Sequence, residues 1–143
     1  MIYLDTSVLV AYYYPETLSE IVQEVVRSES QPAISSLTEV EFMSALARKS
    51  REGGRSQQDA ERIAALFFSH IQEGLYRRLF VSEQHFRQAR DWLQRFQTPL
   101  RTLDALHLAL AADANLHLVT ADKALAISAN GLGVAVQLLS QQQ

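Results

Sequence analysis

Four acidic residues stand where predicted strands end or where the helices that follow them begin. They come from four distant segments of the chain: Asp5, Glu41, Asp104 and Asp122. In an open parallel sheet the carboxyl ends of the strands meet at one edge, and binding groups gather there. Carboxylates crowded at one edge repel each other, and a divalent cation with oxygen ligands relieves that repulsion. The pattern therefore predicts a site for Mg²⁺, with Mn²⁺ as a substitute.

Each acid also has an explanation that involves no catalysis. Asp5 and Asp122 could be helix N-caps, and Thr38-x-x-Glu41 matches a capping box. Asp104 could simply favour a helix N-terminus through the helix dipole. This explanation is weakest for Asp104, because a carboxylate in a nearly all-apolar helix costs several kcal/mol unless it is paired or metal-bound.

The sequence excludes or disfavours other reaction chemistries. The chain has no cysteine, so thiol nucleophiles and thiolate metal sites are excluded. It contains neither a Gly-x-Ser-x-Gly elbow nor a glycine-rich phosphate loop. We expect structural roles for the histidines, which lack ligand spacing: His70, His85, His107 and His117.

Glu39 is the rival of Glu41 for the second acidic position. The two residues are two apart and point to different faces of a helix, so at most one of them faces a site. Glu41 shares its side with Ala45, whereas Glu39 lies at the very start of the predicted helix. Glu41 is therefore the preferred candidate.

The net charge of −3 conceals an uneven distribution along the chain. Residues 1–47 carry seven acids and one base, residues 48–101 six acids and eleven bases, and residues 102–143 three acids and one base. Eleven of the thirteen cations are arginine, the better bidentate phosphate ligand. The middle of the chain is basic, so the total charge does not exclude a polyanionic partner.

Short apolar runs alternate with helical patterns along the chain. The predicted strands are 2–4, 32–35, 79–81, 116–119 and 134–136. The predicted helices are 18–26, 38–50, 56–72, 86–96, 102–114 and 122–128. The helix at 56–72 is expected to bury Ile63, Leu66, Phe67 and Phe68. This alternation predicts an α/β fold with a mainly parallel sheet and helices on both faces.

Length and composition favour one globular domain over residues 1–143, with 48% hydrophobic residues. No apolar stretch approaches the ~20 residues of a membrane span. A charged segment followed by a long apolar segment, as in a signal peptide, is also missing. We therefore expect a cytoplasmic protein that does not associate with membranes.

Four motifs resemble those of the PIN domain, and most closely those of VapC-type toxins from toxin-antitoxin pairs. The motifs are Ile-Tyr-Leu-Asp-Thr-Ser-Val-Leu at 2–9, Ser-Ser-Leu-Thr-x-x-Glu at 35–41, Thr-Leu-Asp-Ala-Leu-His-Leu-Ala-Leu-Ala at 102–111 and Leu-Val-Thr-Ala-Asp at 118–122. They come in the family's order, and the resemblance spans residues 1 to about 139. The sequence departs from the family's pattern after Asp122, where Lys123 stands in place of a further acidic, Asn or aromatic residue.

This resemblance implies a three-layer α/β/α sandwich and a magnesium-dependent endoribonuclease. It also implies an antitoxin protein as partner and a homodimer. The acidic quartet would be Asp5, Glu41, Asp104 and Asp122, with Thr6 or Ser7 and Thr120 as polar support.

Metal-assisted hydrolysis of a phosphodiester needs no side-chain nucleophile. We expect Asp5 and Asp104 to be direct metal ligands, while Glu41 and Asp122 bind a second ion, hold metal waters or act as general base. Because an acidic pocket repels RNA, nearby cations must bind its phosphates. The candidates are Arg48, Lys49, Arg51 and Arg101, each of which could instead belong to a solvated helix face.

Two other functions remain open. A phosphatase of the haloacid-dehalogenase kind also begins with a strand that ends in Asp, but it has a second Asp two residues on, where this chain has Ser7. A catalytically silent interaction module could keep the same fold and bind a partner helix. The presence of all four acids argues against that module.

Overall fold

Five short strands form one sheet in the computed structural model of the chain, which describes residues 1–53 and 56–140. The strands are β1 (Ile2–Leu4), β2 (Ala33–Ser35), β3 (Arg77–Leu79), β4 (His117–Thr120) and β5 (Val136–Leu138). Their order across the sheet is β3-β2-β1-β4-β5, and every neighbouring pair is parallel. The central strand is therefore the first one in the chain.

Side chains that alternate along each inner strand divide the interior into two cores. Tyr3 and Leu118 pack into one core, whereas Leu4 and Val119, the next residue of each strand, pack into the other. Successive side chains of a strand point to opposite faces of the sheet, so both faces must be covered. This is why β1 and β2 are buried throughout and β4 is buried after its first residue, His117.

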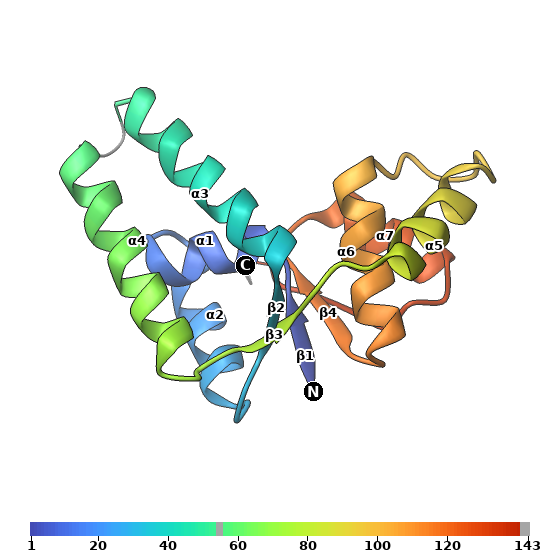
Figure 1. The fold of residues 1–143 in the computed structure, drawn as a ribbon, viewed down its shortest axis with the longest axis horizontal. Coiled ribbons are helices and arrows are strands. Elements are labelled where there is room, and N and C mark those ends of the chain that lie inside the picture. Colours follow the sequence, from blue (N-terminus) through green and yellow to red (C-terminus); the bar gives the residue numbers. More distant parts are fainter. Residues whose placement is uncertain (54–55, 141–143) are drawn as a thin grey trace.

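In the described residues, seven helices cover the two faces of the sheet (Figure 1). Four lie on one side: α1 (Thr6–Tyr13), α2 (Ser19–Arg27), α3 (Ser36–Arg51) and α4 (Gln57–Gln72). Three lie on the other: α5 (Glu83–Leu93), α6 (Thr102–Asp113) and α7 (Lys123–Gly131). The three-layer α/β/α fold with a parallel sheet is thus confirmed.

Several element boundaries differ from the sequence-based expectation. β3 lies at Arg77–Leu79 and β5 at Val136–Leu138, each displaced by two residues from the predicted apolar run. Both are edge strands with largely exposed side chains, so backbone pairing rather than apolar content sets their position. Residues 6–13 form a helix that was not predicted, because this segment is apolar on all sides and shows no amphipathic stripe.

Only part of the predicted burial on α4 occurs. Phe67 is fully buried, but Leu66 and Phe68 are 49% and 46% exposed. Three consecutive residues of a helix cannot all face one neighbour, since each is rotated by about 100° from the last. Within the part of the chain that the structure describes, no helix has the length and apolar character needed to cross a membrane.

Candidate active site

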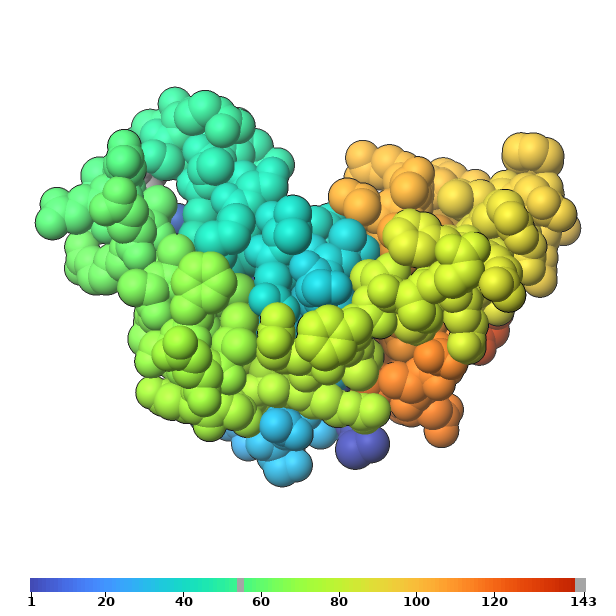
Figure 2. Space-filling view, in the orientation of Figure 1, coloured from blue at the N-terminus to red at the C-terminus, as the bar shows by residue number. Residues whose placement is uncertain are grey.

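A pocket of about 610 Å³ opens where the chain reverses direction across the sheet. From β1 the chain builds outward through β2 and β3, and then returns to place β4 on the other side of β1. Such a switch point leaves a crevice outside the carboxyl ends of the two strands. Figure 2 shows the molecule hollowed between the lobe that carries α3 and the lobe that carries α6. All four predicted acids line the pocket: Asp5, Glu41, Asp104 and Asp122.

Asp5 lies directly after β1 and is held by donors from two segments of the chain. Its Oδ1 accepts hydrogen bonds from the hydroxyl of Ser7 (2.6 Å) and the backbone N–H of Val8 (3.2 Å). Its Oδ2 accepts a hydrogen bond from the hydroxyl of Thr120 (2.6 Å), at the end of β4. Burial raises the pKa of Asp5, although these donors oppose the shift. Asp5 is the N-cap of α1, but capping engages only Oδ1.

Glu41 projects from α3 into the pocket and does not cap the helix. The capping box is formed by Ser35 and Thr38, so the alternative in which Glu41 caps the helix with Thr38 is wrong. Glu41 Oε1 instead accepts a hydrogen bond from the hydroxyl of Thr6 (3.0 Å) and bonds to Nε2 of His107. Burial opposes ionisation, but the attraction of the nearby His107 imidazole and the hydrogen bonds to His107 and Thr6 outweigh it and lower the pKa of Glu41.

Glu39, the rival of Glu41, points elsewhere. Its carboxylate forms a paired hydrogen bond with the guanidinium of Arg78, both distances being 3.0 Å. This pair ties the start of α3 to the edge strand β3. Glu39 is therefore used in a surface ion pair, and Glu41 is the residue that reaches the pocket.

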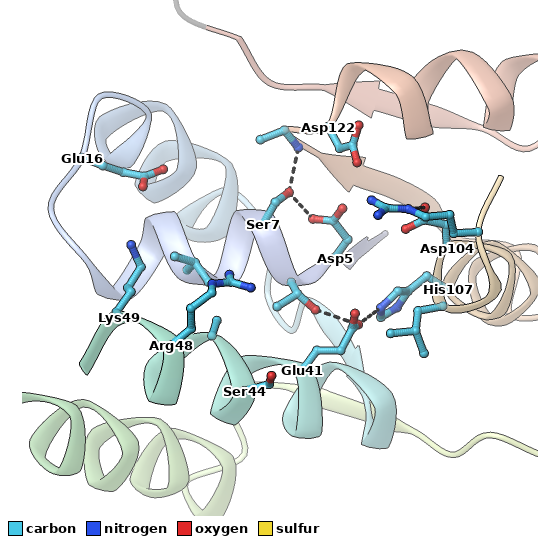
Figure 3. A pocket seen from close by; sticks show the side chains of 16 residues that line it. Asp5, Ser7, Glu16, Glu41, Ser44, Arg48, Lys49, Asp104, His107 and Asp122 are labelled. Carbon is cyan, nitrogen blue, oxygen red and sulfur yellow. Dashed lines mark hydrogen bonds and ion pairs between the residues drawn. The ribbon is translucent and has the colours of Figure 1, made fainter. Parts of the chain in front are cut away.

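Asp104 and Asp122 face the pocket from the other side. The pKa of Asp104 is raised, chiefly by burial and also by the charges of Asp122 and Glu41. The guanidinium of Arg101, whose Nε lies 3.8 Å from Asp104 Oδ2, opposes this shift. Asp122 caps α7, since its Oδ1 accepts from the N–H groups of Ala124 (2.9 Å) and Leu125 (3.2 Å). The capping alternative is thus correct for this oxygen of Asp122, and the residue still lines the pocket (Figure 3).

The family model described as PIN domain matches residues 2–129. The chain belongs to the PIN domain family. The match spans all four acidic positions and confirms the resemblance seen in the sequence motifs. No curated protein shows significant sequence similarity to the chain.

Solved structures with the same fold include toxin-antitoxin proteins at low sequence identity. The FitAB complex bound to an IR36 DNA fragment has a TM-score of 0.75 at 20% identity, covering 100% of this chain and 98% of that chain. VapC20 of Mycobacterium tuberculosis has a TM-score of 0.69 at 18% identity, with 94% and 97% covered. VapBC2 of Rickettsia felis, bound to a promoter DNA fragment, has a TM-score of 0.69 at 18% identity, with 98% and 100% covered.

The PIN domain places three of the four predicted cations around the pocket. Arg48 and Lys49 enter it from the second half of α3, and Arg101 enters from the segment before α6. In Figure 3 the side chain of Arg48 extends from α3 toward the acidic groups. Arg51 does not line this pocket and instead borders a separate pocket between α3 and α4. Residues three apart lie close together on a helix face, so Arg51 differs from Arg48 chiefly by lying one turn nearer the end of α3.

The donor set of the PIN domain pocket suits a hydrated cation better than a cage of protein ligands. Among residues 1–53 and 56–140, no three His, Asp or Glu side chains are arranged close enough to hold a metal ion. Yet several carboxylates face one cavity, and the raised pKa of Asp104 reports that its charge is disfavoured there. Mg²⁺ usually keeps several waters and binds through one or two carboxylates. The residues present therefore fit such an ion.

Within the described part of the chain, three further polar residues line the pocket and were not assigned to it from sequence: Glu16, Ser44 and His107. His107 follows Asp104 by three residues and Ser44 follows Glu41 by three, so helical spacing placed both on the pocket side. Glu16 lies in the connection after α1, where periodicity gives no signal. His107 is buried and hydrogen-bonded, as expected of a structural histidine, but its partner is a pocket carboxylate.

Proposed function

We propose that this PIN domain is a magnesium-dependent endoribonuclease in which an activated water hydrolyses RNA phosphodiester bonds. The observation that carries the proposal is the meeting of four carboxylates, from four separate segments, in one pocket bordered by cations. Such a pocket can bind a divalent ion among the carboxylates and a phosphate at its edge. A nucleophilic side chain is not needed, which agrees with a chain that has no cysteine.

In this proposal Asp5 and Asp104 hold the ion, and Glu41 and Asp122 bind a second ion, hold its waters or act as general base. Mg²⁺ or Mn²⁺ bound there would polarise the phosphate and lower the pKa of a bound water. Ser7 and Thr120 fix the Asp5 carboxylate through hydrogen bonds of 2.6 Å each. Thr6 does the same for Glu41 at 3.0 Å. Asp5 and Glu41 are therefore oriented before any substrate arrives.

The substrate is held by cations at the edge of the pocket. Arg48 and Lys49 stand on the α3 side and Arg101 on the α6 side, so they lie on opposite sides of the acids. Arg101 is highly exposed, with 84% of its side chain accessible. Phosphates on either side of the cleaved bond can thus pair with different lobes, which offsets the repulsion between RNA and the acids.

We further propose that the protein is the toxin of a toxin-antitoxin pair, forms a homodimer and is inhibited by a small antitoxin. VapC20 of Mycobacterium tuberculosis is described as a toxin that cleaves the sarcin-ricin loop. VapBC2 of Rickettsia felis and the FitAB complex are each described as bound to DNA. The first test is whether a short reading frame lies immediately upstream of the gene, and the second is co-expression of the protein with that reading frame's product. A stable complex that suppresses cleavage supports the pairing, and full activity in its presence contradicts it.

The enzymatic proposal is tested with purified protein and end-labelled RNA in Mg²⁺. Wild type should cleave internally, while Asp5→Asn and Asp104→Asn should fold and lose at least about 100-fold in rate, typical of removing a group that stabilises transition-state charge. Asp91→Asn, an exposed change on α5, is the matched control and should cleave like wild type. Equal rates for all four proteins would contradict the proposal.

The same experiment separates the two rival functions. Hydrolysis of a phosphate monoester such as p-nitrophenyl phosphate, with RNA left intact, would favour a phosphatase. Inactivity on both substrates, with an intact fold, would favour a silent interaction module. The geometry speaks against the phosphatase, because Ser7 stands where a second Asp is needed, and its hydroxyl binds Asp5 and the N–H of Ala121.

A further inference from the structure

A buried histidine joins the two helices that carry the candidate catalytic acids. His107 is 2% exposed and lies on α6, one turn after Asp104. We propose that His107 is a positioning residue, which holds the carboxylate of Glu41 on α3 at a fixed place relative to Asp104 on α6. This inference rests on the proposed function and adds a residue to it.

Both ring nitrogens of His107 have a partner. Nδ1 lies 2.6 Å from the hydroxyl oxygen of Tyr3, and Nε2 bonds to Oε1 of Glu41. The ring therefore cannot turn without breaking two hydrogen bonds. Figure 3 shows the imidazole directed at Glu41 across the pocket. A histidine used only to fill space would need no such pair of partners on two other elements.

The ionised carboxylate of Glu41 can only accept a hydrogen bond, so the ring nitrogen that faces it, Nε2 of His107, carries a hydrogen. The Tyr3 side chain is fully buried, and that burial raises the pKa of its phenol, so the hydroxyl keeps its hydrogen. The Tyr3 oxygen lies 2.8 Å from Ser35 Oγ and 3.3 Å from Thr38 Oγ1. It can accept from one of these hydroxyls while it donates to His107 Nδ1. Nε2 then carries the ring hydrogen and donates it to Glu41, as the partner of one nitrogen sets the state of the other.

The chain of hydrogen bonds returns to the helix on which Glu41 lies. Ser35 and Thr38 form the capping box that starts α3, and Glu41 is one turn further along. The path thus runs from the start of α3 through β1 to α6 and back to α3. Over residues 1–53 and 56–140, His107 to Glu41 is the only hydrogen bond between a side chain of α3 and one of α6. In that part of the chain no other hydrogen bond or ion pair joins a side chain of α3 directly to one of α6.

Loss of this contact should displace Glu41 from the other acids. The remaining partner of its carboxylate is the hydroxyl of Thr6 at 3.0 Å. The charges of Asp5, Asp104 and Asp122 around the same pocket repel Glu41. A single hydroxyl on a rotatable side chain resists this repulsion less than a fixed imidazole does. The site would then retain its RNA-binding cations but lose the arrangement of acids that performs the reaction.

The test compares His107→Leu, His107→Gln and a control at the second buried histidine, His85→Leu. His85 is 7% exposed and bonds Asp113 at 3.0 Å between α5 and α6, outside the candidate active site. His107→Leu should lower kcat 10- to 100-fold or raise the half-saturating Mg²⁺ concentration by that factor, as loss of groups behind metal ligands does. KM for RNA should change less than about threefold. His107→Gln should recover most activity, and His85→Leu should lower stability only.

Two further measurements separate positioning from folding. In a Glu41→Ala background, His107→Leu should cause no additional loss, because His107 acts through Glu41. Nitrogen NMR of the imidazole should show the hydrogen on Nε2 in wild type and a mixture of tautomers in Tyr3→Phe. The NMR arm needs no substrate, so it remains decisive even if wild type fails to cleave RNA, a result that would overturn the proposed function alone.

The positioning role is overturned by any of three results: His107→Leu with the kcat and Mg²⁺ dependence of wild type, an added loss in the Glu41→Ala background, or a hydrogen on Nδ1 in wild type.

Discussion

The hydroxyl of Thr120 donates a hydrogen bond of 2.6 Å to Oδ2 of Asp5, and so ties the end of β4 to the end of β1. Oγ1 of Thr120 in turn accepts a hydrogen bond of 3.0 Å from the backbone N–H of Asp122. Thr120 is fully buried, so its hydroxyl has no access to water as an alternative partner. One hydroxyl thereby joins two of the candidate catalytic acids at the switch point of the sheet.

Replacing Thr120 by valine should therefore destabilise the protein by about 1–3 kcal/mol, the cost of leaving buried polar groups unsatisfied. Thr120→Ser keeps the hydroxyl and should lose less. Urea unfolding followed by circular dichroism measures both variants. Equal stability of Thr120→Val and wild type would show that the hydrogen bond to Asp5 contributes nothing.

Asp5→Asn should make the metal-free protein more stable at neutral pH while it abolishes activity. Burial raises the pKa of Asp5 in the folded state, so its contribution to stability is present below the unfolded pKa and is lost as the pH rises through the folded pKa. The asparagine has no charge to desolvate and avoids this loss. For a domain of this size, about 1 kcal/mol shifts Tm by roughly 4 °C.

Thermal unfolding in EDTA from pH 4 to pH 8 checks this sign. The Tm difference between Asp5→Asn and wild type should grow as the pH rises. Asp91→Asn, at an exposed position, should follow wild type throughout. A difference that shrinks with rising pH would mean that ionised Asp5 is favoured by its surroundings.

Mg²⁺ should stabilise wild type and stabilise Asp104→Asn much less. A ligand that binds only the folded state adds RT ln(1 + [L]/Kd), about 2.7 kcal/mol at 100 times Kd. Removing Asp104 takes away one proposed ligand and some of the repulsion that the ion relieves. Thermal unfolding across a Mg²⁺ titration measures the effect. Identical Mg²⁺-induced shifts in both proteins would remove Asp104 from the proposed metal site.

Arg48→Ala should weaken RNA binding, while Arg51→Ala, one turn further along α3, should not. Arg48 lines the acidic pocket, whereas Arg51 borders the separate pocket between α3 and α4. Loss of one phosphate contact should reduce the slope of log affinity against log salt by roughly 0.7. Fluorescence anisotropy with labelled RNA at several salt concentrations gives this slope. Equal effects of both variants would indicate general charge attraction rather than a defined contact.

Phe67→Ala should cost about 3–5 kcal/mol of unfolding free energy, the range for a buried phenylalanine. Phe67 is fully buried on α4. The centroid of its ring lies 4.8 Å from that of Phe42 on α3 and 5.6 Å from that of Tyr13 on α1. Phe68→Ala, at a side chain that is 46% exposed, should cost about 1 kcal/mol or less. Similar losses of unfolding free energy in Phe67→Ala and Phe68→Ala would contradict the burial of Phe67 and the exposure of Phe68.

Local patterns predicted the inner parts of the fold better than its edges. β1 and α6 lie where apolar content and terminating residues placed them, because both elements are buried on most sides. β3 was misplaced because Arg77 is exposed and its position is set by pairing with Ala33 of β2. No sequence period reports such a pairing between distant residues.

The acids of the site were accessible from sequence because each follows a strand or begins a helix, and the parallel sheet brings those ends together. The contact of His107 with Glu41 was not accessible in this way. It joins residues 66 positions apart, and its geometry depends on how closely α3 and α6 approach each other. The ion pair between Glu39 and Arg78 was not accessible from sequence for the same reason, because it depends on how residues far apart in the chain pack together.

The central claim is that the acidic pocket cleaves RNA with a divalent ion, and the Mg²⁺ dependence of single-turnover cleavage tests it most directly. Wild type with end-labelled RNA should show no cleavage in EDTA and a saturable rise with Mg²⁺, reproduced by Mn²⁺. Asp5→Asn should stay inactive at every concentration. Undiminished cleavage by wild type in EDTA, or cleavage by Asp5→Asn at the rate of wild type, would contradict the account.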